Sequence, residues 1–141
     1  MRKIALVSCA KRKLSKPAKG RDLYISPLFQ KSREWAERNC NEWYILSAKY
    51  GLVRPSRRLA PYEKTLNAMS SREREEWAHY VFKQMKNAGV IKYGVQFVWL
   101  AGQSYKENLS CLLQPFIQRD PMKGLKMGER LQWLSKRSNY V

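Results

Sequence analysis

The sequence is poor in acidic residues and has one histidine, His79, so the side chains that most often serve as general acids and bases are scarce. Its 141 residues include 11 Asp and Glu against 28 Lys and Arg, which gives a formal net charge of +17. A compact chain with so large an excess of one sign repels itself, and an excess of this kind is most simply tolerated when the partner is a polyanion. The composition therefore predicts a nucleic-acid partner, with single- or double-stranded DNA as the first candidate.

Cysteines and long apolar runs are also scarce. Cys9, Cys40 and Cys111 have no metal-like spacing, and no secretory signal is apparent. Free thiols in a reducing cytoplasm are expected, with no metal and no other cofactor. No apolar segment is long enough to span a bilayer, so no membrane association is expected, and the oligomeric state stays open. With no repeat and no low-complexity linker, residues 1–141 are expected to form a single α/β domain.

Three short apolar runs predict the strands of a sheet. They cover residues 3–8, 43–47 and 95–100, and none shows the polar alternation of a half-exposed strand, which favours buried parallel strands. A short fourth strand is expected at residues 115–117. Helices are predicted from Pro27 to about Asn39, from Ser70 or Ser71 to Asn87, over residues 104–114 and over residues 129–134. The fold class is a three-layer α/β fold, Rossmann-like, with a short, mostly parallel sheet of three to four strands flanked by helices.

Each predicted strand runs into a loop of small, cationic or aromatic residues. The carboxyl ends of parallel strands share one edge of a sheet, and ligands bind in the crevice beyond that edge. Rings and cations together suit a site that stacks a base and holds its phosphates. The candidate substrate-binding residues are Ser8, Cys9, Lys11, Lys13, Tyr24, Ser47, Lys49, Tyr50, Tyr62, Gly102, Gln103 and Tyr105.

Asp22 is the candidate catalytic residue. An enzyme that removes a base from DNA needs an extruded nucleotide, an aromatic ring to stack it and a polar group that positions water or stabilises a cationic sugar. Asp22 is the carboxylate expected near the candidate residues, with Glu63 in reserve; the alternative is that Asp22 caps a turn or pairs with Arg21. Cys9 as a nucleophile lacks a nearby histidine base. Lys11 or Lys13 could form a Schiff base with an abasic sugar, since neighbouring cations ease deprotonation of a lysine.

Several blocks of sequence resemble a bacterial and phage domain family. The blocks are Ser8-Cys9-x-Lys11-x-Lys13, Asp22-Leu23-Tyr24-x-Ser26-x-x-Phe29, Leu46-Ser47-Ala48-Lys49-Tyr50-Gly51-Leu52, Pro61-Tyr62-x-x-Thr65-Leu66 and Gly124-x-x-x-Gly128-x-x-Leu131-x-Trp133-Leu134. That family is distantly similar to the peroxide-stress YaaA proteins, which are implicated in DNA protection, and the likeness extends over nearly the whole chain.

This resemblance implies a fold of the uracil-DNA-glycosylase class and a link to phage-defence glycosylases that act on glucosylated cytosine. It implies that Asp22 is the acid and that Tyr24 stacks the base. Lys11, Lys13 and Lys49 would then contact phosphates. The chain departs from uracil-DNA glycosylases because it lacks the usual Gly-Glu or Gly-Gln start and the late His-Pro-Ser loop.

The function expected from the sequence is a cytoplasmic, DNA-binding N-glycosylase that extrudes and excises a modified or damaged base, with modified cytosine of phage DNA as the candidate substrate. One alternative is a non-catalytic DNA-binding or DNA-protection protein. Another is a glycosyl transferase that processes nucleosides or nucleotides, although free nucleotides leave the charge of +17 unexplained.

Overall fold

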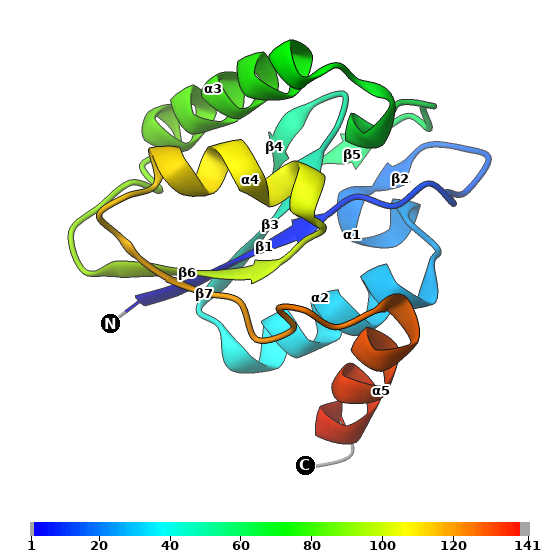
Figure 1. Cartoon of the computed structure of the whole chain (residues 1–141). Helices are drawn as coiled ribbons and strands as arrows, with labels where there is room; N and C mark the ends of the chain where they lie inside the picture. Colours follow the sequence, from blue (N-terminus) through cyan, green and yellow to red (C-terminus); the bar gives the residue numbers. More distant parts are fainter. Residues whose placement is uncertain (1, 139–141) are drawn as a thin grey trace.

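The computed structural model describes residues 2–138 and contains a five-stranded sheet in the order β4-β3-β1-β6-β7 (Figure 1). The strands are β1 (Arg2–Ser8), β3 (Glu42–Ser47), β4 (Gly51–Val53), β6 (Val95–Leu100) and β7 (Ile117–Arg119). Strand β1 pairs in parallel with β3 on one side and with β6 on the other, and β7 extends the parallel order. The three apolar runs are therefore confirmed as the central strands, whose two faces are both covered.

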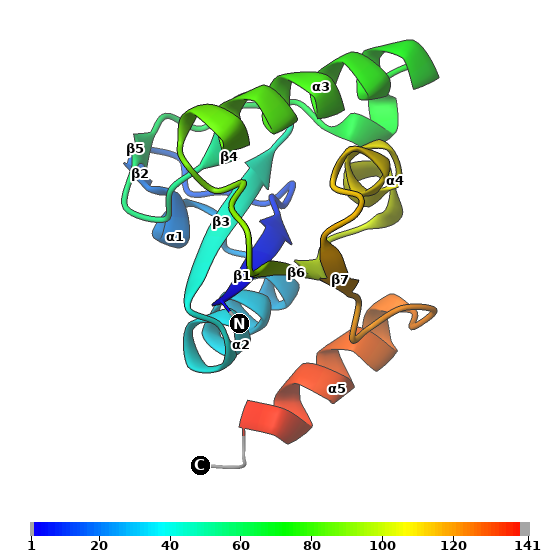
Figure 2. The same cartoon turned by 90° about the vertical axis from the view of Figure 1, so that its left-hand side faces the viewer.

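Helices cover both faces of this sheet, which confirms the three-layer α/β fold. Helices α2 (Pro27–Asn39) and α5 (Met127–Ser138) pack together on one face, and α3 (Ser71–Asn87) and α4 (Gln103–Leu112) pack together on the other (Figures 1 and 2). Within residues 2–138, no helix has the length and apolar character needed to cross a membrane.

The two longest helices begin where the sequence predicts. The hydroxyl of Ser26 accepts a hydrogen bond from the N–H of Phe29 at 3.1 Å, and Pro27 occupies the first turn of α2. Ser70 and Glu73 form a reciprocal capping box, in which each side chain accepts from the other residue's N–H. Both caps satisfy backbone donors that the helix itself leaves unpaired.

Alternate residues of β1 divide the core between the two faces. Ile4 and Leu6 belong to the apolar cluster beneath α3 and α4, whereas Ala5 and Val7 belong to the cluster beneath α2 and α5. All four are buried. Because β1 is central and faces helices on both sides, its carboxyl end is held firmly by packing from every direction.

The order of the strands makes the carboxyl end of β1 a topological switch point. The chain passes from β1 through α2 to β3 on one side, and from β3 through α3 to β6 on the other side of β1. The connections therefore diverge at the carboxyl end of β1, which is where open α/β sheets bind their ligands.

Several short elements extend the expected fold. Strand β4 adds an antiparallel fifth strand to an expected sheet of three to four, and β2 (Ala18–Lys19) pairs with β5 (Arg58–Leu59) in a separate ribbon. A four-residue helix α1 (Gly20–Leu23) and a 3₁₀ turn η1 (Leu66–Ala68) were also not expected. Elements of two to four residues are too short to leave a hydrophobic period in the sequence, so long-range contacts define them.

The last strand of the sheet begins two residues later than predicted. Pro115 has no N–H to donate to a ladder. The N–H of Phe116 is used in a turn, where it donates to the carbonyl of Leu113 at 2.9 Å. Parallel pairing with β6 therefore starts at Ile117.

A tight turn joins β3 to β4 and fixes the segment that follows Ser47. Gly51 has φ +74°, a conformation that L side chains rarely adopt, and a Cβ there would overlap the side-chain oxygen of Gln84 on α3. Gln84 also accepts from the N–H of Leu52 at 2.8 Å and donates to the carbonyl of Tyr50 at 3.1 Å. Helix α3 thereby holds residues 50–52 beside the carboxyl edge of the sheet.

Candidate functional site

The exits of β1 and β6 meet at Cys9 and Tyr105. The N–H of Cys9 donates to the carbonyl of Leu46 on the neighbouring strand at 2.9 Å, which fixes the backbone just beyond β1. The Cys9 Sγ lies 3.2 Å from the hydroxyl of Tyr105, which projects from the first turn of α4. Two residues 96 positions apart in the sequence are thus in contact at the switch point.

Tyr62 is the centre of a buried hydroxyl cluster. Its hydroxyl lies 2.7 Å from the hydroxyl of Tyr24 and 2.7 Å from the Oγ of Ser47. Ser47 ends β3, and its Oγ also accepts from the N–H groups of Lys49 and Tyr50. Because hydroxyls both donate and accept, the three groups can satisfy one another in a place that is closed to water.

Trp77 of α3 joins the hydroxyl cluster to Tyr105. Its indole Nε1 donates to the carbonyl of Ser47 at 2.9 Å, and its ring lies edge-on to the ring of Tyr105 with centroids 5.6 Å apart. The sequence placed Trp77 only in an apolar helix stripe. The hydrogen bond of its indole N–H was not predicted, because the spacing of apolar residues along a helix does not indicate which carbonyl the indole will contact.

Burial determines the protonation of the tyrosines. It raises the pKa of Tyr24, Tyr62 and Tyr105, and a thiolate at Cys9 would raise the pKa of each further. Desolvation disfavours the charged form of a group, so these phenols stay protonated at neutral pH. They are hydrogen-bond donors and cannot serve as general bases.

Lys13 reaches back over the same rings. Its Nζ lies 4.4 Å from the ring centroid of Tyr62 and 5.7 Å from that of Tyr24, and it donates to the carbonyl of Lys11 at 3.1 Å. Burial lowers the pKa of Lys13, whereas negative charge on Cys9 or Glu63 acts in the opposite direction. A half-buried lysine therefore lies directly against the hydroxyl cluster.

Two backbone hydrogen bonds hold the loop that carries Lys13. The N–H of Leu14 donates to the carbonyl of Leu23 at 2.9 Å, and the N–H of Ile25 donates to the carbonyl of Arg12 at 3.0 Å. Lys13 and Tyr24 thus form an isolated antiparallel bridge. The position of Lys13 is set by the backbone as well as by its own contacts.

Tyr50 presents a partly exposed ring beside two cations. Its ring lies edge-on to that of Tyr62 with centroids 5.5 Å apart. The Nζ of Lys49 is 5.2 Å and the Cζ of Arg57 is 5.1 Å from its centroid. Sequence reasoning described the segment of Arg57 only as basic and irregular. A ring flanked by cations is an arrangement that binds bases and phosphates together.

A family model described as "Family of unknown function (DUF6884)" matches residues 4–136. The chain belongs to DUF6884. The uncharacterized protein YfjM of Bacillus subtilis (strain 168) is 34% identical over 61 residues, which cover 39% of this chain and 41% of that relative. The match therefore spans less than half of the curated relative's length. No solved structure matches the chain significantly.

This DUF6884 protein separates the two residues that were expected to act together. The Asp22 side chain is 52% exposed, and its carboxylate lies 3.8 Å from the Nε of Arg21, which is the pairing foreseen as the alternative. Tyr24 is fully buried, and the centroid of its ring lies 4.9 Å from the ring centroid of Phe29. In this conformation Tyr24 has no face open to a base.

The other predicted residues lie around the edge of the DUF6884 sheet. Ser8 is half-buried at the end of β1, and Gly102 is the residue that precedes α4. Lys11, Lys49 and Gln103 are exposed, each within a few residues of a strand's carboxyl end. Cys9, Lys13 and the tyrosines therefore form the interior of the candidate site. The residues around it form its rim, which comprises Ser8, Lys11, Lys49, Gly102 and Gln103.

A small hollow of about 40 Å³ opens beside Cys9 on the α2 side. Ser8, Cys9 and Ala10 line it together with Ser26 and Ser32 of the α2 segment. Cys9 lies between this hollow and the tyrosines, since it packs against the apolar clusters on both faces of the sheet. Among residues 2–138, no group of three or more His, Cys, Asp and Glu side chains is placed to hold a metal ion.

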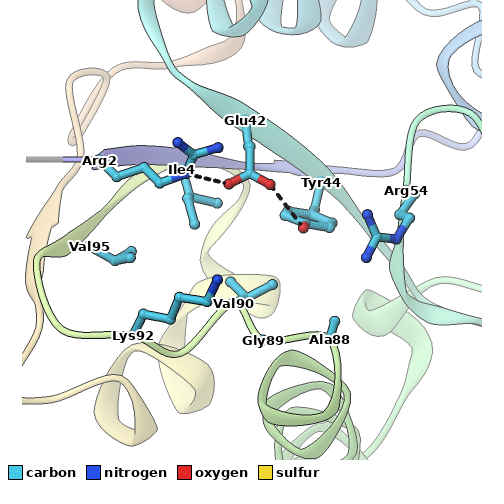
Figure 3. A pocket seen from close by; sticks show the side chains of 10 residues that line it. All are labelled: Arg2, Ile4, Glu42, Tyr44, Arg54, Ala88, Gly89, Val90, Lys92 and Val95. Atoms are coloured by element: carbon cyan, nitrogen blue, oxygen red, sulfur yellow. Dashed lines mark hydrogen bonds and ion pairs between the residues drawn. The ribbon is translucent and has the colours of Figure 1, made fainter.

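A second hollow, of about 90 Å³, lies at the opposite, amino-terminal edge of the DUF6884 sheet (Figure 3). Arg2, Arg54 and Lys92 contribute cations to its lining, but the Glu42 carboxylate accepts from the Nε of Arg2 at 2.7 Å and from the Tyr44 hydroxyl at 3.4 Å. None of the residues predicted for the site lines this hollow. Glu42, the one acidic residue of its lining, is already paired with Arg2 and Tyr44. We therefore assign the candidate site to the carboxyl edge.

The ion pair at the amino-terminal edge is expected to add little stability. Arg2 and Glu42 side chains are 55% and 35% exposed, so water screens their attraction. We expect Glu42→Gln to lower the free energy of unfolding by less than about 1 kcal/mol in urea titrations. The exposed Glu75→Gln on α3 is the matched control, and a loss of several kcal/mol for Glu42→Gln alone would contradict this assignment.

Proposed function

We propose that this protein binds DNA and excises a modified or damaged base by cleaving its N-glycosidic bond. The observation that carries the proposal is the ring of Tyr50, partly exposed between Lys49 and Arg57 and backed by the buried hydroxyl of Tyr62. An extruded nucleotide needs a ring for its base and cations for its flanking phosphates, and both occur side by side at the switch point.

The charge of the chain supports DNA as the substrate rather than a free nucleotide. A net charge of +17 attracts a long polyanion and releases its counterions, whereas a single nucleotide can engage only a few of these cations. The resemblance of the sequence blocks to the YaaA proteins and to enzymes of the uracil-DNA-glycosylase class supports the same substrate.

The buried phenols suit the leaving group. When the bond between C1′ and the base breaks, the base departs with the electron pair and becomes more basic, so hydrogen-bond donors near it lower the barrier. Tyr62 of the cluster and the nearby Tyr105 are protonated phenols, and Cys9 lies against Tyr105. Asp22, from the resemblance, is the proposed group that positions water.

The test is release of a base from DNA. The purified chain is incubated with phage DNA that carries glucosylated or hydroxymethylated cytosine, with unmodified DNA and with the matching nucleotides. Released small molecules are identified by mass spectrometry, and abasic sites by strand breaks in hot alkali. The proposal expects a free base from modified DNA. Release of a base from nucleotides but not from DNA would support the glycosyl transferase alternative. If no substrate released a base, the proposed base excision would be wrong.

Asp22→Asn tests the catalytic assignment separately. If Asp22 positions water, we expect base release to fall about 100-fold or more with DNA binding unchanged, since the amide cannot accept a proton. The exposed Glu75→Gln on α3 removes the same charge at a remote surface and should release base at the parent rate. An active Asp22→Asn protein would move the role to another residue and leave the activity in place.

The position of Asp22 also favours a second candidate, a DNA-binding protein without catalysis. Its half-exposed carboxylate pairs with Arg21 and makes no hydrogen bond to the tyrosine cluster among the described residues. Such a protein would bind DNA with steep salt dependence and would release no base in the assay above.

A further inference from the structure

Lys13 differs from the exposed lysines of the rim because its amine lies over the rings of the hydroxyl cluster. The side chain is half-buried, and its Nζ lies 4.4 Å from the centroid of the Tyr62 ring. Lys11 and Lys49, by contrast, are exposed. Position and burial therefore single out Lys13 from its neighbours in the same loops.

We propose that Lys13 is a nucleophile toward the sugar, so that the protein cleaves the DNA strand at an abasic site through a covalent link to this lysine. The inference rests on the proposed function, because it uses the abasic deoxyribose that base excision leaves behind. Amine nucleophiles in enzymes are made reactive by desolvation, and Lys13 alone of the loop lysines adjoins a buried cluster.

The chemistry balances without a further reactant. The Nζ lone pair attacks the C1′ aldehyde of the ring-opened sugar, and the two amine hydrogens leave with the carbonyl oxygen as water. Loss of a proton from C2′ then breaks the C3′–O bond, and the 3′ phosphate departs with the electron pair. Water finally hydrolyses the C=N bond and frees Lys13.

Three features of the site suit this step. The hydrogen bond from Nζ to the carbonyl of Lys11 fixes the amine, and a neutral amine can donate it as well as a charged one. Burial lowers the pKa of Lys13, which enlarges the unprotonated fraction at neutral pH. The rings of Tyr62 and Tyr24 confine the side chain on one side, and the side chain remains partly exposed.

The experiment is reductive trapping on a duplex oligonucleotide with one abasic site. Sodium borohydride reduces the C=N bond to a stable C–N bond, so the full-length protein migrates with the DNA on a denaturing gel. We expect trapping by the parent chain and a fall of at least about 100-fold in Lys13→Gln. Peptide mapping by mass spectrometry should find the reduced sugar on Lys13.

Two variants separate a nucleophile from a phosphate contact or a folding defect. Lys13→Arg keeps the positive charge over the Tyr62 ring but cannot form the C=N bond, so it should bind abasic DNA and fail to trap. Lys16→Gln, exposed in the same loop, should trap at the parent level. Trapping by Lys13→Arg, or an adduct mapped to another lysine, would overturn the inference.

The two assays distinguish a failure of this inference from a failure of the proposed base excision. Base release from modified DNA with no trapped complex would refute the role of Lys13 and leave the glycosylase standing. Trapping at Lys13 without base release from any DNA would confirm the lysine and refute the glycosylase.

Discussion

Replacing Tyr62 by phenylalanine should lower the free energy of unfolding by about 2–4 kcal/mol, because it leaves two buried hydroxyls without their shared partner. Tyr24 and Ser47 both lie 2.7 Å from the Tyr62 hydroxyl, and both are fully buried. The ring of phenylalanine fills the same space, so the loss reports the hydrogen bonds rather than a cavity. Urea or guanidinium titration gives the change from the midpoint at constant m value.

Tyr93→Phe is the matched control, since Tyr93 is fully exposed and the same atom is removed. We expect its effect to stay within about 0.5 kcal/mol of zero. If Tyr62→Phe also left the free energy of unfolding unchanged, water would be entering the hydroxyl cluster, and the cluster would not be closed to solvent. The double variant Tyr24→Phe/Tyr62→Phe should cost less than the two single variants together, because each single change already breaks their common hydrogen bond.

The same cluster shows how much of the site follows from local patterns. Buried apolar runs identified β1, β3 and β6, and parallel strands must end on one edge. That reasoning brought together Cys9, Ser47 and Tyr105 from three distant segments, and the structure confirms that they lie at one edge. Strand patterns are reliable here because burial on both faces leaves few polar residues in the runs, of which Gln96 is the one inside β6.

Asp22 and Tyr24 show where local patterns fail. They are two residues apart, and the structure places them at the four-residue helix α1, which the sequence did not reveal. Asp22 lies on α1, whereas Tyr24 follows the helix with an extended backbone, so the two side chains take different directions. When Tyr24 turns into the core, Asp22 is directed to solvent beside Arg21. The two were expected to share a site because both lie just before the helix that begins at Pro27.

Trp77 and Arg57 were missed for a related reason. Trp77 belongs to the apolar stripe of a helix, and Arg57 directly precedes a two-residue strand, so neither local pattern points to the site. Only the packing of α3 over the sheet and the pairing of β2 with β5 bring them to the edge. Long-range packing therefore determines which cations and hydrogen-bond donors reach the site, whereas the strands determine where in the fold the site lies.

Binding to duplex DNA should weaken steeply with salt if the rim cations contact phosphates. Three contacts, from Lys11, Lys49 and Arg57, predict a slope of about −3 in log K against log salt, or roughly a 40-fold loss of affinity between 50 and 200 mM. In the double variant Lys49→Gln/Arg57→Gln the slope should become less steep by about 2, because two counterions are no longer released. Fluorescence anisotropy across a salt series measures both quantities.

A second double variant locates the binding face. Lys86→Gln/Lys92→Gln removes the same charge near the amino-terminal edge, where Lys92 lines the hollow of Figure 3 and Lys86 lies two residues before Ala88. The long-range field of the protein falls by the same amount in both variants, so it cannot distinguish them. If DNA phosphates contact the carboxyl edge directly, the salt slope becomes less steep in Lys49→Gln/Arg57→Gln and does not change in Lys86→Gln/Lys92→Gln. Equal changes in the two variants would mean that DNA is held by the overall charge and not by the rim around Tyr50.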